Sequence, residues 1–156
     1  MLNHDLEKWT CFIVLMGFLV PIISNDIRRK RIPDVYTIPG SLCLYLIRSL
    51  FFHHYFIFID AVIAYLIIML LWFLSAGKIG RGDAKLSALI AMGTGFLGWC
   101  IAVFWASTTG LVTALILRKG NKIKKKEGIP FAPFLAAGSI ISFFTKDLFM
   151  RLLYVQ

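Results

Sequence analysis

The sequence predicts an all-α fold, a polytopic membrane bundle of about six transmembrane helices that forms a single domain over residues 1–156. The chain is 59% hydrophobic with a mean hydropathy of +0.80, which is too apolar for a soluble domain of 156 residues. Its apolar residues form several runs of membrane-spanning length. The formal net charge of +9 is concentrated in short loops between these runs. That arrangement favours a topology signal and contact with anionic lipid head groups over nucleic-acid binding.

The first half of the chain is expected to contain three spans. The first covers about residues 9–23, and the basic cluster 28–31 follows it directly. This order is typical of a stop-transfer segment, and no small-residue cleavage site follows, so we expect an uncleaved span. The second and third spans are expected at about 37–52 and 55–76.

Polar residues in and between these spans have simpler expected roles. Arg48 is expected to snorkel to the interface, and Asp60 to be an interfacial or inter-helix hydrogen-bonding residue. His53 and His54 are adjacent, and adjacent residues do not share a helix face, so no metal site is expected there. The three cysteines are isolated and form no C-x-x-C pair, so neither a zinc site nor a disulfide framework is expected.

The second half of the chain is expected to contain three more spans. A fourth helix begins at Asp83 and runs to about Phe96, where the glycines at 93, 95 and 98 break it. A fifth span covers about 99–117, and a strongly basic loop follows it. The sixth span begins within 129–134 and extends at least to residue 144. Prolines are tolerated in its first turn, because the N–H groups there have no intrahelical partner.

The distribution of lysine and arginine predicts the topology. The loops after the first, third and fifth spans, at 28–31, 78–85 and 118–126, carry 13 of the 17 basic residues. We therefore expect a multi-pass protein of the cytoplasmic membrane. The positive-inside rule predicts that its basic loops lie in the cytoplasm and that both termini lie outside. Asp26 and Asp83 then lie on the same, cytoplasmic side.

The segment Gly80–Leu86 is the strongest candidate for a functional site. It places Asp83 between a glycine-rich turn and the apolar run 86–96. An ionisable residue at membrane depth is a functional-site hypothesis by default, and its partner has to be identified. Asp26, at the end of the first apolar run, is the best candidate for that partner.

Two facing aspartates can hydrolyse a peptide bond. Their like charges separate the two ionisations, so one is a carboxylate while the other is an acid. The carboxylate takes a proton from a water that attacks the peptide carbonyl, and the acid stabilises the developing oxyanion. This mechanism needs no metal, cofactor or covalent intermediate. The sequence has no G-x-S-x-G, no HExxH and no suitable Cys/His pair that would favour another hydrolase class.

Three further residues of this segment have expected roles. Gly80 and Gly82 are expected to adopt backbone conformations closed to other residues and to let a substrate backbone approach. Lys85 is expected to steady the charge of Asp83, to hold a lipid phosphate, or to act as a plain snorkelling anchor.

Two motifs of the chain resemble those of a known family, the GxGD-type aspartic peptidases that process type IV prepilins. Residues 80–86, Gly-Arg-Gly-Asp-Ala-Lys-Leu, are similar to the family's signature. Asp26 and the following Ile32-Pro33 resemble its first catalytic aspartate and the Ile-Pro-Asn after it. Asp34 stands where that family usually has asparagine.

A third motif extends the resemblance over nearly the whole chain. Residues 129–134, which include Pro130, Phe131 and Pro133, are similar to the family's late Ile-Pro-Phe-Gly-Pro-Phe, with Ala132 in place of glycine. The resemblance implies that Asp26 and Asp83 are catalytic. It also implies that the short basic leader is cut from prepilin or pseudopilin precursors at the cytoplasmic face. Larger relatives carry an additional N-terminal region and also N-methylate the product, so peptidase activity alone is expected here.

Two other functions remain open from the sequence. A non-catalytic pilin assembly factor could bind pilin-like helices without cutting them, although such a protein would normally lose one aspartate. A small proton-coupled transporter could use Asp26 and Asp83 as a relay. It would be expected to carry polar residues at mid-membrane in several spans, and the sequence has few.

Overall fold

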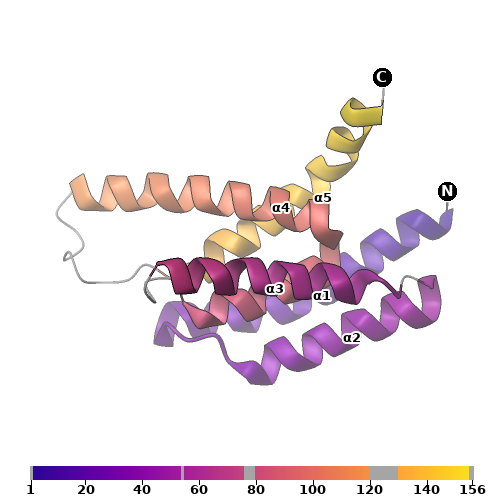
Figure 1. The fold of residues 1–156 in the computed structure, drawn as a ribbon, viewed down its shortest axis with the longest axis horizontal. Helices are drawn as coiled ribbons and strands as arrows, with labels where there is room; N and C mark the ends of the chain where they lie inside the picture. Colours follow the sequence, from indigo (N-terminus) through magenta and orange to yellow (C-terminus); the bar gives the residue numbers. More distant parts are fainter. Residues whose placement is uncertain (1, 54, 76–79, 120–129, 155–156) are drawn as a thin grey trace.

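Helices account for most of the chain in the computed structural model, which describes residues 2–53, 55–75, 80–119 and 130–154 (Figure 1). His54, the turn at 76–79, Ile129 and residues 120–127 of the predicted basic loop lie outside the described residues. The helices are α1 (Leu2–Arg29), α2 (Asp34–Phe52), α3 (Ile57–Leu74), α4 (Arg81–Lys119) and α5 (Ala132–Tyr154). The predicted all-α class is therefore confirmed for the described residues.

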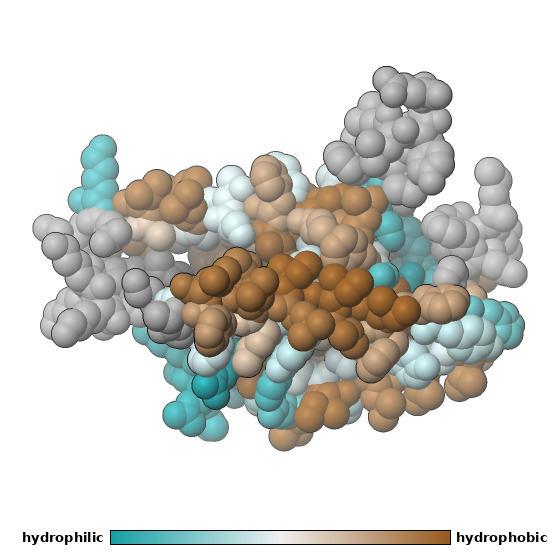
Figure 2. Space-filling view, in the orientation of Figure 1, coloured by the Kyte–Doolittle hydropathy of each residue, from teal (hydrophilic) through white to brown (hydrophobic). Residues whose placement is uncertain are grey.

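The helices have the length and composition of a multi-pass membrane protein. Within the described residues, four segments are long and apolar enough to cross a bilayer, at 6–29, 34–52, 57–74 and 81–117. Figure 2 shows large apolar side chains over the outer face of α3, as expected for a surface in contact with lipid. The prediction of six spans remains a prediction.

The long helix α4 is broken at Gly95. This residue has φ 77° and ψ 170°, a conformation that side-chain-bearing residues rarely adopt. The predicted break in this apolar run is thus confirmed and is located at one of the three glycines. After it the helix turns back along the bundle (Figure 1), so that Gly110 lies near Phe131, at the segment that leads into α5.

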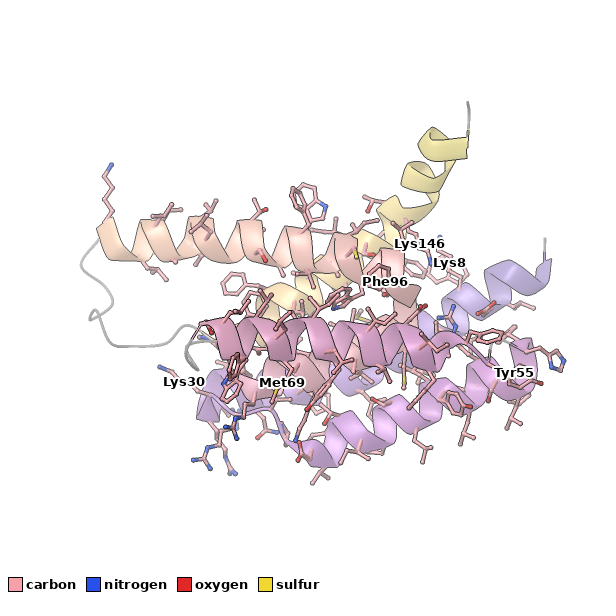
Figure 3. All side chains as sticks on the ribbon, viewed as in Figure 1. Lys8, Lys30, Tyr55, Met69, Phe96 and Lys146 are labelled. Carbon is pink, nitrogen blue, oxygen red and sulfur yellow. The ribbon has the colours of Figure 1, made fainter. Side chains whose placement is uncertain are left out.

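Charged side chains of neighbouring helices form hydrogen bonds with backbone groups at this break. Lys146 Nζ of α5 donates to the carbonyl oxygen of Thr94 over 2.7 Å. Asp60 Oδ2 of α3 accepts the backbone N–H of Phe96 over 3.2 Å, which confirms its prediction as an inter-helix hydrogen-bonding residue. A cation at a helix C-terminus and a carboxylate at an N-terminus both match the helix dipole. Figure 3 shows Lys146 and Phe96 together at this end of the bundle.

The prediction that Arg48 snorkels to the interface is wrong. Its side chain is 13% exposed and forms an ion pair with Glu7 of α1, with 2.9 Å between Nη2 and Oε1. Its Nη1 donates to the carbonyl oxygen of Met92 over 3.0 Å. The break at Gly95 leaves that carbonyl near a helix end, where a donor from outside the helix is needed. Arg48 therefore joins α1, α2 and α4.

The second half of α4 packs closely on α5. At Gly138, an added β-carbon would overlap the carbonyl oxygen of Ala102. The buried residues Ala106, Ala132 and Ala136 are also small, and small residues let helix backbones approach closely in membranes. This contact holds α5, and the segment before it, against the rest of the bundle.

Candidate active site

A pocket of about 700 Å³, with many charged residues in its lining, lies where three segments of the chain meet. Its walls are residues 25, 26 and 29–34, from the end of α1 to the start of α2, residues 80–83 and 85 at the start of α4, and Pro130-Phe131 before α5. Figure 2 shows hydrophilic side chains at this end, where Lys30 is labelled in Figure 3, and Tyr55 lies at the opposite end. Residues of all three predicted motifs therefore line one pocket.

Asp26 lies in the last turn of α1. The sequence placed it just after the first span, but the helix continues to Arg29. Asp26 is 6% exposed, and its Oδ2 accepts the backbone N–H of Ala132 over 3.1 Å. Its carbonyl oxygen accepts the N–H of Lys30 over 2.8 Å, which closes the end of α1. The side chain thus fixes the start of α5 while it faces the pocket.

Asp83 lies in the first turn of α4, as predicted, and is partly buried. Its backbone N–H donates to the carbonyl oxygen of Gly80 over 3.1 Å. Asp83 and Asp26 line the same pocket. The structure therefore brings together the two carboxylates that the sequence analysis paired.

Gly80 and Gly82 contribute to the site because the absence of a side chain lets neighbouring groups approach closely. The prediction that they adopt backbone conformations closed to other residues is wrong, because neither has a positive φ. A β-carbon at position 82 would lie 2.9 Å from Ile32 Cβ, so only glycine lets the start of α4 pack against the loop after α1. A β-carbon at position 80 would lie 3.1 Å from Asp83 Oδ2. The absence of a side chain there leaves room for the Asp83 carboxylate.

An ion pair joins the start of α2 to α4. Pro33 is the N-cap residue of α2. Asp34 begins that helix and accepts from Lys85 Nζ over 2.6 and 2.7 Å through its two carboxylate oxygens. The partner of Lys85 in the structure is thus Asp34, a residue that the sequence analysis did not pair with it. The two residues are 51 positions apart, and no local signal links them.

The proline-rich segment before α5 forms a helix start that Asp26 completes. The carbonyl oxygen of Phe131 accepts the N–H groups of Phe134 and Leu135, each over 3.1 Å. Pro133 lies in the first turn, where its missing N–H costs little. The N–H of Ala132 has no partner within the helix and is directed at Asp26.

Arg81 contributes a contact that the sequence analysis missed. Its guanidinium carbon lies 4.3 Å from the centre of the Trp72 ring on α3, which is a cation–π distance. This contact holds the residue between Gly80 and Gly82 against α3. One indication of this contact was present in the sequence, because Trp72 and the basic residue Arg81 are both expected near the same membrane interface.

The geometry can support hydrolysis. Two carboxylates with like charge share a partly enclosed pocket that is open to water, and one can hold a proton while the other is ionised. Backbone hydrogen bonds and close packing hold both of them in place. These are the elements of acid–base activation of a water molecule.

The fold and the pocket define a multi-pass membrane protein with a paired-carboxylate site. A model of the Type IV leader peptidase family matches residues 13–115, about two thirds of the chain, and the chain belongs to that family. This confirms the family that the resemblance indicated. The matched region contains both aspartates and the Gly80–Lys85 segment.

The similar curated proteins are named prepilin leader peptidase/N-methyltransferase. The chain is 29% identical over 145 residues to the protein of Legionella pneumophila and 32% identical over 145 residues to that of Xanthomonas campestris. These matches cover 86% and 87% of this chain and 50% of each relative. A Bacillus subtilis relative is 26% identical over 138 residues, covering 86% of this chain and 55% of the relative. The chain thus spans about half the length of these relatives. No solved structure matches the chain.

Proposed function

We propose that the protein is a membrane-embedded aspartic endopeptidase that cuts the short basic leader from type IV prepilin-like precursors. The observation that carries the proposal is the single pocket that contains Asp26, Asp83 and residues of all three motifs. Family membership supports the reaction class, and the names of the relatives suggest the substrate class.

In the proposed reaction, the two aspartates activate a water together. The ionised carboxylate removes a proton from the water, whose oxygen attacks the scissile carbonyl. The protonated carboxyl group donates a hydrogen bond to the carbonyl oxygen as negative charge develops there. When the tetrahedral intermediate collapses, the C–N bond breaks, and the leaving amine takes up the proton that the base removed. This chemistry requires no cofactor, and the proposal assigns the peptidase step alone to these residues.

The pocket is proposed to face the cytoplasm. The basic residues 28–31 follow Asp26 in sequence, and Lys30 lies at the pocket end in Figure 3. Positive charge beside membrane spans is typical of the cytoplasmic side. Residues 28–31 are exposed, and a basic leader would be repelled by them. We therefore assign them to anionic lipid phosphates rather than to the leader.

A precursor-processing experiment tests this function. The chain is co-expressed with an epitope-tagged prepilin-like precursor from its own genome, and the new N-terminus of the product is sequenced by mass spectrometry. The proposal predicts a shortened product that begins at the first residue of the apolar helix. An uncut precursor, in cells where both proteins reach the membrane, would contradict it.

A further inference from the structure

A second depression adjoins the candidate active site. It has a volume of about 370 Å³, and its lining surface is almost entirely apolar. We call it the α2–α3 groove, because α2 and α3 form its two sides and the first half of α4 forms its floor. Lys85 lines both the groove and the active-site pocket. The groove thus begins two residues beyond Asp83.

The groove follows the axis of α4 away from the pocket. The α4 residues in its floor are Lys85, Ala88 and Met92, which share one face of the helix. They cover about 10 Å at 1.5 Å per residue, or about two helical turns. The groove can therefore receive one face of about two turns of another helix.

The groove opens sideways because α2 and α3 contact each other much less than they contact α4. Two other sides of the pocket are held together by contacts. Asp26 is hydrogen-bonded to the start of α5, and Gly82 is packed against Ile32. The groove therefore offers a route from the pocket towards the bilayer that separates neither of these two contacts.

The change in polarity at Lys85 indicates an occupant. On one side of Lys85 the walls include the carboxylates of Asp26 and Asp83, and on the other side they are apolar. A chain whose scissile bond lies at the aspartates would have its polar part in the pocket and its apolar part in the groove. The proposed substrate has this order, with a charged leader followed directly by an apolar helix.

We propose that the α2–α3 groove binds the first two turns of the apolar helix that follows the scissile bond of the substrate. This inference rests on the proposed function and adds to it the surface that recognises the substrate helix. Lys85 lies where the substrate would pass from the pocket, which holds the leader, to the groove, which holds the helix. Its ion pair with Asp34 is exposed to water, so a passing chain can displace it at little cost.

Two neighbouring residues of α3 provide a matched test. Val62 lines the groove and is 38% exposed, whereas Ile63 does not line it and is 39% exposed. A photo-crosslinking amino acid is placed at each position in a chain that also carries Asp83→Asn, so that bound precursor is not consumed. The proposal predicts a precursor adduct from position 62 and at least tenfold less from position 63. Equal yields, or lipid adducts alone from position 62, would overturn it.

A kinetic measurement gives a second readout with active enzyme. Val62→Trp fills the groove and is expected to raise KM for the precursor at least tenfold, with kcat changed less than threefold. Ile63→Trp is expected to change neither. Unchanged kinetics in Val62→Trp, or a loss of kcat alone, would overturn the proposal. If the native chain cleaves no precursor, the proposed function itself fails. If the native chain cleaves the precursor and Val62→Trp leaves the kinetics unchanged, only the groove proposal fails.

Discussion

Gly82 and Ile32 are in contact across the candidate active site. The position that a β-carbon would occupy at residue 82 lies 2.9 Å from Ile32 Cβ, closer than side-chain carbons approach one another. Residue 82 immediately precedes Asp83, and Ile32 lies in the loop that follows the helix of Asp26. This contact therefore sets how closely the segments that carry the two aspartates approach each other.

Gly82→Ala is expected to impair catalysis more than folding. The added methyl group would push the start of α4 away from Ile32 and move Asp83 relative to Asp26. Displacement of a reacting group by about 1 Å can lower a rate about 100-fold. We expect a loss of cleavage rate of about 10- to 100-fold, with a small change in thermal stability. The control is Gly17→Ala, where a β-carbon would meet nothing within 4 Å. Equal rates in both variants would contradict the account.

Gly138→Ala is expected to destabilise the bundle. A β-carbon there would overlap the backbone of Ala102, which cannot move without shifting α4. Overpacking of this kind costs about 1–3 kcal/mol, and more where backbone is involved. Thermal unfolding in detergent is the measurement. Gly110→Ala is the control, because its β-carbon would make only ordinary contacts of 3.7 Å or more. A Gly138→Ala protein as stable as this control would show that the helices pack differently.

The ion pairs Arg48–Glu7 and Lys85–Asp34 are expected to differ in their contribution to stability. Arg48→Met removes a buried partner of Glu7 and a donor to Met92, so it should lower the free energy of unfolding by about 3 kcal/mol. Lys85→Met breaks a pair whose side chains are 42% and 51% exposed, which should cost about 0–1 kcal/mol. Denaturation of both variants under the same conditions measures the difference. Equal losses would argue against a buried Arg48.

Cleavage is expected to have a bell-shaped pH dependence. The proposed mechanism needs one ionised and one protonated aspartate. In acid both carboxyl groups hold protons and no base remains, and at high pH both are ionised and no acid remains. The rate should therefore fall on both sides of an optimum, and kcat/KM measured over a pH series would show it. A rate that rises to a plateau with pH would mean that a single ionisation suffices.

Features that depend on local composition could be predicted from the sequence. Hydropathy predicted the apolar helices, because burying apolar residues in lipid requires long uninterrupted runs. The glycine cluster predicted the break in α4, since glycine adopts the positive φ found at Gly95. Asp26 and Asp83 were recognisable because carboxylates are rare beside such runs. Their placement at one pocket agrees with that prediction.

Features that depend on helix packing could not be predicted. The hydrogen bond from Ala132 to Asp26 joins residues 106 positions apart. Arg48 was expected at the interface because its long side chain permits snorkelling, but Glu7 and the carbonyl of Met92 lie within its reach. Such contacts are set by how each helix is rotated about its axis, and a single sequence with near-uniform apolar faces gives little indication of that rotation.

The measurement that tests the central claim most directly is precursor cleavage by purified protein in lipid nanodiscs with one pocket carboxylate changed at a time. Asp26→Asn and Asp83→Asn should each abolish cleavage, whereas Asp34→Asn, in the same pocket but paired with Lys85, should lower the rate by a few-fold at most. All three substitutions keep the size of the side chain, so protein yield and thermal stability should remain close to those of the native chain. Cleavage that survives both Asp26→Asn and Asp83→Asn would contradict the two-aspartate mechanism.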